Sequence, residues 1–345
     1  MNCQIKTWLV YVIFIMFWKQ NIAQTVNTPF IQKMKGGLIF KDYKNVLLAI
    51  DKEIPLVHDD KLLSTLYLYR GKADVGLKST KEAIKDFNAS IKYNSKCYEA
   101  FVLRSKVYLD LNDFINAEKD ISDAIQLNNM YSDAYIVRGK LQIQKNNSQL
   151  ALVDFNKAVE LNKLNPDAFC MRALAKKNLN DFVGSLEDYK QALLIDENHS
   201  DTYFLRSELF VAMKKYKEAI EDLNFAVEMD EGNELLYYSR SQVKMLTKDY
   251  KGAEKDLKSV LEYNPDYVFA YYYLGIIKAQ NSDYKGAIKL FDKSLSLVSN
   301  DFNSLYQRGL AKQKIGDKSG ACNDVKKAGA LGHLLAQEWI SKNCK

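Results

Sequence analysis

Histidines and glycine-rich turns are the first places to look for chemistry in this sequence, and they offer little. The chain has three histidines, His58, His199 and His333, and no two of them stand at the spacing of a metal motif or a catalytic triad. The segment GDKSG at residues 316–320 lacks the residue order of a phosphate-binding loop. The sequence therefore predicts no enzyme activity, no cofactor and no metal site.

A 34-residue spacing organises most of the chain, and it first shows in a column of arginines. These are Arg70, Arg104, Arg138, Arg172, Arg206, Arg240 and Arg308, with Leu274 in the remaining place. Small residues follow thirteen positions later, at Ala83, Ala117, Ala151, Ser185, Ala219, Ala253, Ala287 and Ala321. Four positions further on stand bulky apolar residues, at Phe87, Ile121, Phe155, Tyr189, Leu223, Leu257, Phe291 and Val325. Spacings of three and four put such columns on one helical face, which we expect to be buried between closely packed helices.

This unit resembles the tetratricopeptide repeat, with an aromatic residue at position 4, a small residue at 8, alanine at 20 and a bulky apolar residue at 24. Eight repeats follow in register, at residues 64–97, 98–131, 132–165, 166–199, 200–233, 234–267, 268–301 and 302–335. The position-4 aromatics are Tyr67, Phe101, Tyr135, Phe169, Tyr203, Tyr237 and Tyr271, with Leu305 in the last repeat. The resemblance implies an all-α fold, a right-handed α-solenoid of stacked helix–turn–helix units that binds other proteins. The sequence departs from the family at position 32, where proline occurs only as Pro265, and at position 7, where arginine replaces leucine.

The arginines change together with a second column. Position 23 is aspartate in seven repeats, at Asp86, Asp120, Asp154, Asp188, Asp222, Asp256 and Asp324. In repeat 7, where Leu274 replaces the arginine, Leu290 replaces the aspartate. We infer an Arg–Asp pair between the two helices of each repeat, replaced once by a leucine contact, because a buried charge that loses its partner is costly.

Composition excludes several classes of protein. Apolar residues make up 47% and charged residues 27% of the chain, values typical of a folded globular protein. The net charge is +6 and falls to +4 without residues 1–23, whose charges are Lys6 and Lys19, so nucleic acid is not an expected partner. Residues 1–23 place an apolar run from Trp8 to Trp18 after Lys6, which resembles a signal peptide cut after Ala23. The alternatives are an uncleaved N-terminal anchor and a cytosolic chain.

Both ends of the solenoid are expected to differ from its middle. Residues 24–63 read as a degenerate N-terminal capping repeat whose turn lies three residues off the 34-residue spacing, with a loosened connection at Pro55. A last amphipathic helix is expected from about Leu334 to Ser341, with residues 336–345 as the end of the cap and Trp339 sealing repeat 8. If that helix folds back, Cys322 and Cys344 can meet in a disulfide; the alternative is two separate thiols.

Partners of this family lie in a concave groove lined chiefly by positions 2, 5, 9, 12 and 13, with 33 and 34 from the connections. In repeats 1 to 3, position 9 holds Lys72, Lys106 and Lys140. Position 2 of repeats 2 to 5 holds the acids Glu99, Asp133, Asp167 and Asp201. The lysines and acids form either a self-neutralising ladder, in which each lysine faces the acid of the next repeat, or a polar track that binds an acidic peptide.

Aromatic residues gather instead in repeats 5 to 8. Position 5 holds Phe204, Tyr238, Tyr272 and Tyr306, joined by Phe269 at position 2 and Tyr267 at position 34. A run of exposed aromatic residues is typical of protein interfaces, although such residues can also fill the groove by packing on neighbouring helices. Position 5 begins Leu68, Val102 and Ile136, so the clamp with which some relatives grip chaperone C-termini is absent.

The sequence thus predicts a non-enzymatic scaffold that is exported, to the periplasm, to the outer membrane or out of the cell, and that holds a protein or peptide in its groove. The alternatives are a receptor-like module that captures a small ligand or glycan on the same tyrosines, and a subunit of an outer-membrane or secretion assembly. A protein should engage many repeats at once, whereas a small ligand should need one or two tyrosines. With a cleaved signal peptide, contact with a membrane would be indirect.

Overall fold

The computed structural model describes residues 29–344, so the predicted signal peptide lies outside the described residues. All regular secondary structure in the described range is helical, which confirms the all-α solenoid class. None of these helices is both long and apolar enough to cross a membrane.

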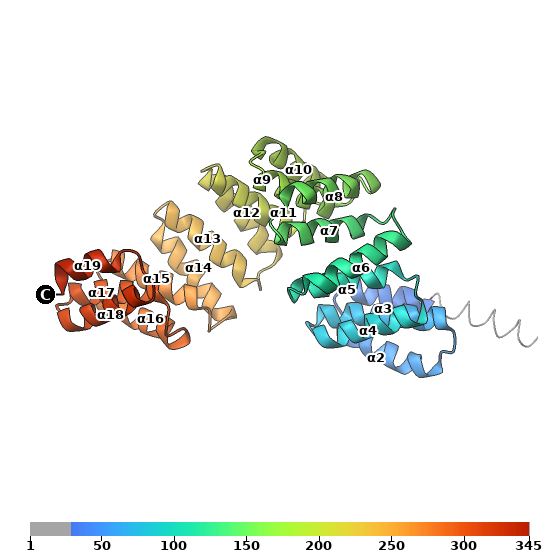
Figure 1. The fold of residues 1–345 in the computed structure, drawn as a ribbon, viewed down its shortest axis with the longest axis horizontal. Coiled ribbons are helices and arrows are strands. Elements are labelled where there is room, and N and C mark those ends of the chain that lie inside the picture. The colour runs from blue at the N-terminus through green and yellow to red at the C-terminus, as the bar shows by residue number, and fades with distance from the viewer. Residues whose placement is uncertain (1–28, 345) are drawn as a thin grey trace, which may run out of the picture. The chain divides into compact units, whose positions relative to one another are not determined.

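The described residues divide between Ala175 and Lys176 into two compact bodies, each made of successive helix pairs (Figure 1). In the first body, helical residues 29–39 precede α2 (Tyr43–Glu53), the 3₁₀ turn η1 (Ile54–Leu56), α3 (Asp60–Gly76), α4 (Thr80–Tyr93), α5 (Tyr98–Asp110), α6 (Phe114–Leu127), α7 (Ser132–Gln144), α8 (Ser148–Leu161) and most of α9 (Pro166–Asn178). The second body continues with α10 (Phe182–Ile195), α11 (Ser200–Ala212), α12 (Tyr216–Met229), α13 (Glu234–Leu246), α14 (Tyr250–Tyr263), α15 (Val268–Gln280), α16 (Tyr284–Leu297), α17 (Phe302–Lys314), α18 (Lys318–Ala330) and α19 (Ala336–Asn343).

Short polar turns join the two helices of each repeat, as the Asn and Asp residues there indicate. In repeat 2, Asn112 adopts a positive φ of 58° and reverses the chain, and the carboxylate of Asp113 accepts a hydrogen bond from the backbone N–H of Asn116. That bond satisfies one of the N–H groups that the first turn of α6 would otherwise leave unpaired. The same position 15 has a positive φ in every repeat, at Lys78, Asn112, Asn146, Asn180, Lys214, Lys248, Ser282 and Gly316.

Small residues at position 8 let the paired helices approach closely. A Cβ atom added to Gly275 would lie 2.6 Å from the ring of Phe291, and one added to Gly71 would lie 2.7 Å from the ring of Phe87. Both rings are fully buried. Glycine at these places is therefore required by the large residue at position 24 of the second helix.

The inferred Arg–Asp pairs are present between the two helices of a repeat. In repeat 2, Arg104 donates from Nε and Nη2 to Asp120 at 2.7 and 2.6 Å, and the aspartate is 3% exposed. The same pair joins Arg70 to Asp86, Arg138 to Asp154, Arg206 to Asp222, Arg240 to Asp256 and Arg308 to Asp324. In repeat 7 Leu274 is buried in an apolar cluster that Leu290 contacts, as the paired substitution predicts.

The arginines also make two contacts that the sequence pattern did not indicate. The guanidinium of Arg104 lies 5.5 Å from the ring centroid of Phe101 at position 4, and its Nη1 donates to Asn88 on α4, in the preceding repeat. Arg240 similarly reaches Asn224 at 2.9 Å, and Arg308 reaches Asp292 at 2.7 Å. One side chain thus fixes the two helices of its own repeat and the stacking of that repeat on its predecessor.

The N-terminal helix pair differs from the repeats in its phase. Its turn residue with positive φ, Lys41 (φ 58°), precedes Lys78 by 37 residues instead of 34. The three residues of η1, which contains Pro55, stand in the connection to α3 and account for the displacement. The pair still packs on repeat 1, since Met34, Val46 and Leu66 share one buried cluster.

At the other end, α19 folds back onto repeat 8. Trp339 and Ile340 pack against a cluster that includes Tyr306 and Val325, so the tryptophan seals the last repeat as expected. The helix begins and ends two residues later than the sequence analysis placed it. The sulfur atoms of Cys322 and Cys344 are joined, with Cα atoms 5.7 Å apart.

One buried acid stands apart from these pairs. Asp74 on α3 is 7% exposed and faces Asp86. Burial raises the pKa of Asp74 to about 6, and the charge of Asp86 and a hydrogen bond to it add to the rise, while Arg70 opposes it. The folded state therefore binds this proton more tightly than the unfolded chain does, and the resulting stabilisation is present below the unfolded pKa and is lost as the pH rises through about 6.

We expect Arg104→Leu to destabilise the N-terminal body by about 3 kcal/mol, because it leaves the buried Asp120 without its cation. The double variant Arg104→Leu/Asp120→Leu should recover most of that loss, since repeat 7 holds leucine at both places. Urea denaturation, with hydrogen exchange of α5 and α6, measures both effects. A double variant no more stable than the single one would contradict the pairing.

We expect Asp74→Asn to stabilise the protein at pH 8 by about 2 kcal/mol, because asparagine keeps a hydrogen-bond donor beside Asp86 without a second charge. The gain should shrink at pH 4.5, where the carboxyl is protonated in the fold. Thermal melts at the two pH values test this, and an equal gain at both would show that the charge of Asp74 has no role.

Candidate functional site

The lysines at position 9 of repeats 1 to 3 form the first predicted part of the site. Lys72 makes an ion pair with Glu99 of the next repeat, with Nζ and Oε1 2.5 Å apart, so the first rung of the predicted ladder is present. The second rung is not, because Asp133 instead accepts from the hydroxyl of Tyr131 at 3.4 Å and from the amide of Asn165 at 3.4 Å. The lysines are therefore not a uniformly self-neutralising set.

The two remaining lysines differ in environment. Lys106 is half-buried, and that burial lowers the pKa of its amine although Asp133 opposes the change. Lys140 is exposed. Neither forms an ion pair with a described residue, and the exposed amine of Lys140 is the one open to an anionic group of a partner.

The position-5 aromatics of repeats 5 to 8 do not form one exposed column. Tyr306 is only 8% exposed and stacks on His333 with ring centroids 3.9 Å apart, so the expectation of a groove-facing Tyr306 is wrong. The cause is the returning C-terminal segment, which brings His333 against α17. Phe204 packs partly buried against the cores formed by α12 and α13, and Tyr272 packs against Phe291, where burial raises the pKa of its hydroxyl to about 12.

Tyr238, the remaining position-5 aromatic, meets three further rings in repeats 6 and 7, and we call Tyr238, Tyr267, Phe269 and Tyr273 the aromatic cluster. The ring centroid of Tyr238 lies 5.2 Å from that of Tyr267, 6.3 Å from that of Phe269 and 6.1 Å from that of Tyr273. The rings of Tyr267 and Phe269 meet edge to face at 6.3 Å. Burial, together with the neighbouring Tyr273 and Tyr267, raises the pKa of Tyr238 well above its ordinary value.

The connection between α14 and α15 places two of these rings. The side chain of Asn264 accepts from the backbone N–H of Asp266 at 3.2 Å, and the carbonyl of Asn264 accepts from the N–H of Tyr267 at 3.1 Å. This turn holds Tyr267 just before the first residue of α15 and Phe269 in its first turn. Phe269 is 58% exposed, which makes it the most accessible ring of the aromatic cluster.

Sequence reasoning missed four residues around this surface. Tyr273 stands at position 6, Glu234 at position 1, Leu235 at position 2 and Gln242 at position 9. Leu235 is 45% exposed, and the charge of Glu234 adds to the burial that raises the pKa of Tyr267. The repeat numbering could have found Leu235 and Gln242, whereas Tyr273 is recognisable only from its contacts with Tyr238 and Tyr272.

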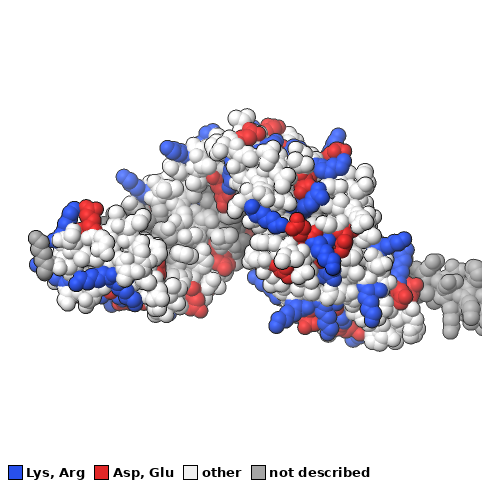
Figure 2. Space-filling view, in the orientation of Figure 1, with Lys and Arg blue, Asp and Glu red and all other residues white. Residues whose placement is uncertain are grey.

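The two predicted parts of the groove differ in charge. Repeats 1 to 3 carry lysine at position 9, whereas positions 2, 5, 9, 12 and 13 of repeats 6 and 7 contain no Lys or Arg. In the view of Figure 2, blue and red side chains are interspersed over α3–α8, and the surface over α13–α15 is mostly white. A partner of the aromatic cluster would thus be held by apolar and π contacts rather than by basic side chains.

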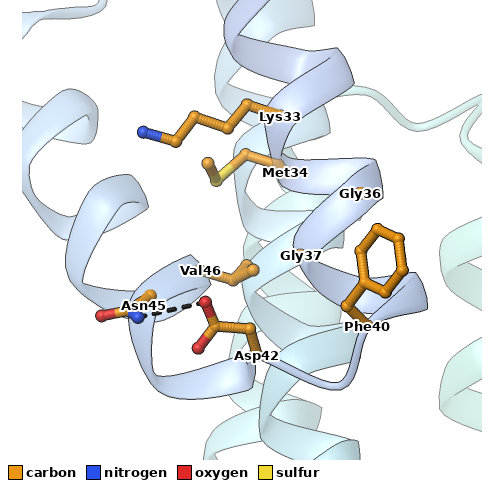
Figure 3. A pocket seen from close by; sticks show the side chains of 8 residues that line it. All are labelled: Lys33, Met34, Gly36, Gly37, Phe40, Asp42, Asn45 and Val46. Atoms are coloured by element: carbon orange, nitrogen blue, oxygen red, sulfur yellow. Dashed lines mark hydrogen bonds between the residues drawn. The ribbon is translucent and has the colours of Figure 1, made fainter.

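A cavity of about 330 Å³ lies elsewhere, between helical residues 29–39 and α2 (Figure 3). Gly36 and Gly37 open it, Phe40 stands at its edge, and its polar groups include Asp42, which accepts from the amide of Asn45 at 3.0 Å. The residues that line it contain no histidine and no cluster of converging acids. It is therefore a weaker candidate than the aromatic cluster.

The described residues hold no group of three or more His, Cys, Asp or Glu side chains arranged for a metal ion. His199 contacts the hydroxyl of Thr202 at 2.7 Å, His333 stacks on Tyr306, and His58 is exposed. In the GDKSG segment, the carboxylate of Asp317 accepts from the N–H of Gly320 at 2.8 Å and caps α18. This arrangement is a helix cap rather than a phosphate site.

Comparison with known proteins agrees with the repeat geometry. Sequence profiles described as tetratricopeptide repeat match residues 247–302, 132–163 and 200–233. The chain contains tetratricopeptide repeats. Such repeats generally mediate contacts between proteins. No curated protein sequence matches the chain at a significant level.

Solved structures share the repeat fold at low sequence identity. PilF of Pseudomonas aeruginosa is 20% identical, with a TM-score of 0.54 over 61% of this chain and 97% of its own. A tetratricopeptide repeat protein of Parabacteroides merdae is 19% identical, with a TM-score of 0.51 over 72% and 99%. The C-terminal part of a repeat protein of Cytophaga hutchinsonii is 16% identical, with a TM-score of 0.53 over 69% and 98%. These similarities establish the fold alone.

Proposed function

We propose that this protein is a non-enzymatic scaffold that holds a segment of a partner protein on the aromatic cluster. The observation that carries the proposal is the meeting of four aromatic rings, three of them at groove positions, with Phe269 58% exposed and Leu235 beside them 45% exposed. Tyrosine supplies apolar area and a hydroxyl together at little cost in conformational entropy, and such residues dominate the energetics of protein interfaces.

The arrangement of the rings favours a peptide over a glycan. Sugar rings stack on a flat aromatic face, whereas Tyr238 is inclined by 50° to Tyr267 and by 41° to Phe269, and Tyr267 is inclined by 65° to Phe269. An uneven surface of this kind suits side chains of different shape along one segment. Capture of a glycan or another small ligand is therefore the alternative, and crosslinking distinguishes it from the binding of a protein.

We further propose that the scaffold acts after export, in the periplasm, at the outer membrane or outside the cell. The hydrophobic N-terminal run supports this, as does the placement of Cys322 and Cys344 in a disulfide. Membership of an outer-membrane or secretion assembly is compatible with the same location.

The disulfide gives a direct test of the compartment. Non-reducing peptide mapping of the protein isolated from its own cells should recover Cys322 joined to Cys344, and Cys344→Ser should lower the stability of repeat 8 by about 3 kcal/mol, because the bond closes a loop with a sequence separation of 22. Two free thiols in the isolated protein would contradict export to an oxidising compartment.

Site-specific crosslinking tests the scaffold proposal. A photo-crosslinking amino acid at Leu235 should capture a protein in the producing cells, and Tyr267→Ser/Phe269→Ser should reduce that capture by at least tenfold, because the exposed ring of Phe269 and the partly buried ring of Tyr267 are lost.

The matched control is Val183→Ser/Leu194→Ser, which removes two apolar residues that are 82% and 77% exposed on α10. Capture should survive in that control. Equal capture by both double variants, or adducts that contain only glycan, would overturn the protein-binding proposal.

A further inference from the structure

The protein places its own cations over the position-4 aromatic rings of repeats 1 to 7. At position 4, the arginine of position 7 lies 5.0–5.5 Å from the ring centroid in repeats 1 to 6. In repeat 7, where Leu274 replaces that arginine, Lys293 lies 5.8 Å from the ring of Tyr271. By contrast, no lysine or arginine of the described residues lies over any ring of the aromatic cluster.

The electrostatic surroundings of the aromatic cluster favour positive charge. Glu234 stands one helical turn before Tyr238 on α13, and its charge contributes to the raised pKa of Tyr267. Glu234 makes no ion pair with any residue in the described range, and Asp266 lies next to Tyr267 in the sequence. The aromatic faces carry a negative quadrupole, so the carboxylate and the rings attract the same kind of group.

The buried side-chain amide of Gln242 indicates that the bound cation belongs to a peptide. Gln242 follows Tyr238 by one helical turn on the same side of α13, and its Nε2 is buried without a hydrogen bond to any described residue. A buried donor without an acceptor is costly, and the carbonyl of a bound peptide would satisfy it. A small quaternary ammonium ion has no such acceptor, so the amide favours a peptide as the source of the cation.

We infer that the aromatic cluster, with Glu234 and Gln242, binds a basic segment of the partner, one of whose Lys or Arg side chains lies against the rings of Tyr238, Tyr267 and Phe269. This inference rests on the proposed function and adds the chemistry of the partner. Glu234 pairs with the cation, and Gln242 donates to a backbone carbonyl of the segment. The whole chain has a net charge of +6, so a basic peptide is not attracted to it by net charge.

Fluorescence anisotropy with a labelled 15-residue peptide of alternating glycine and arginine tests the inference on the full chain at 150 mM NaCl. The comparison peptide carries citrulline, a neutral isostere, in place of each arginine. We expect the arginine peptide to bind at least tenfold more tightly. Equal affinities of the two peptides would overturn the inference that the partner segment is basic. If crosslinking from Leu235 still depended on Tyr267 and Phe269, the proposed scaffold function would stand even though this inference had failed.

Variants distinguish the contribution of the Glu234 charge to peptide binding from that of the aromatic rings. Glu234→Gln should weaken the arginine peptide three- to tenfold, and Tyr267→Leu/Phe269→Leu should weaken it about tenfold although apolar area is kept. Glu228→Gln, at an exposed position of α12, is the matched control and should change nothing. Melting temperatures close to that of the unmodified chain show that the variants are folded. Loss of binding in Glu228→Gln but not in Glu234→Gln would overturn the assignment.

A separate experiment distinguishes a peptide side chain from a small ammonium ion as the source of the cation. Tetramethylammonium at millimolar concentration should compete poorly with the peptide, and Gln242→Leu should weaken the peptide without changing the binding of tetramethylammonium. Strong competition by the small ion, with peptide affinity unchanged in Gln242→Leu, would overturn the peptide in favour of a small ammonium ligand.

Discussion

The contact between the arginine at position 7 and the aspartate at position 23 is the interaction on which the rest of the structure depends. In repeat 2 the guanidinium of Arg104 binds Asp120 through two hydrogen bonds, covers the ring of Phe101 and reaches Asn88 in the preceding repeat. A planar group with five donors in fixed directions can do all of this at once, whereas a lysine could not. In the repeats where both contacts occur, the orientation of the helix pair and its stacking on the previous one are therefore set by the same side chain.

The repeat that lacks this contact contributes two of the four rings of the aromatic cluster, Phe269 and Tyr273. Repeat 7 replaces the ion pair with Leu274 and Leu290 and carries three consecutive tyrosines, Tyr271 to Tyr273. An apolar contact has no directional requirement, so packing rather than hydrogen bonding holds α15 in place. The aromatic cluster thus lies at the junction between repeat 6, which keeps the ion pair, and the repeat in which the regular pattern is relaxed, and functional sites generally depart from the rules that specify the fold.

Much of the fold could be predicted because each repeat uses local, periodic contacts. The exchange of Arg and Asp for Leu274 and Leu290 was readable from two columns. The burial of Tyr306 could not be predicted, because it depends on His333 returning from beyond the repeat to stack on it. Tyr273 was missed for a related reason: its ring belongs to the site only through contacts between two repeats, which a position within one repeat does not specify.

The turns between paired helices have a consequence for how this protein can change over time. Seven of the eight repeats place a residue other than glycine in the left-handed region, and Lys78, Lys214 and Lys248 have no short polar side chain to ease that conformation. An L-residue there costs roughly 1 kcal/mol, and glycine would remove that cost at the expense of some entropy in the unfolded chain. Glycine substitutions at these exposed turns would therefore raise the stability of the repeat array. Substitutions that improve the groove but weaken a helix can be compensated at a distant turn, without any change in the surfaces that meet a partner.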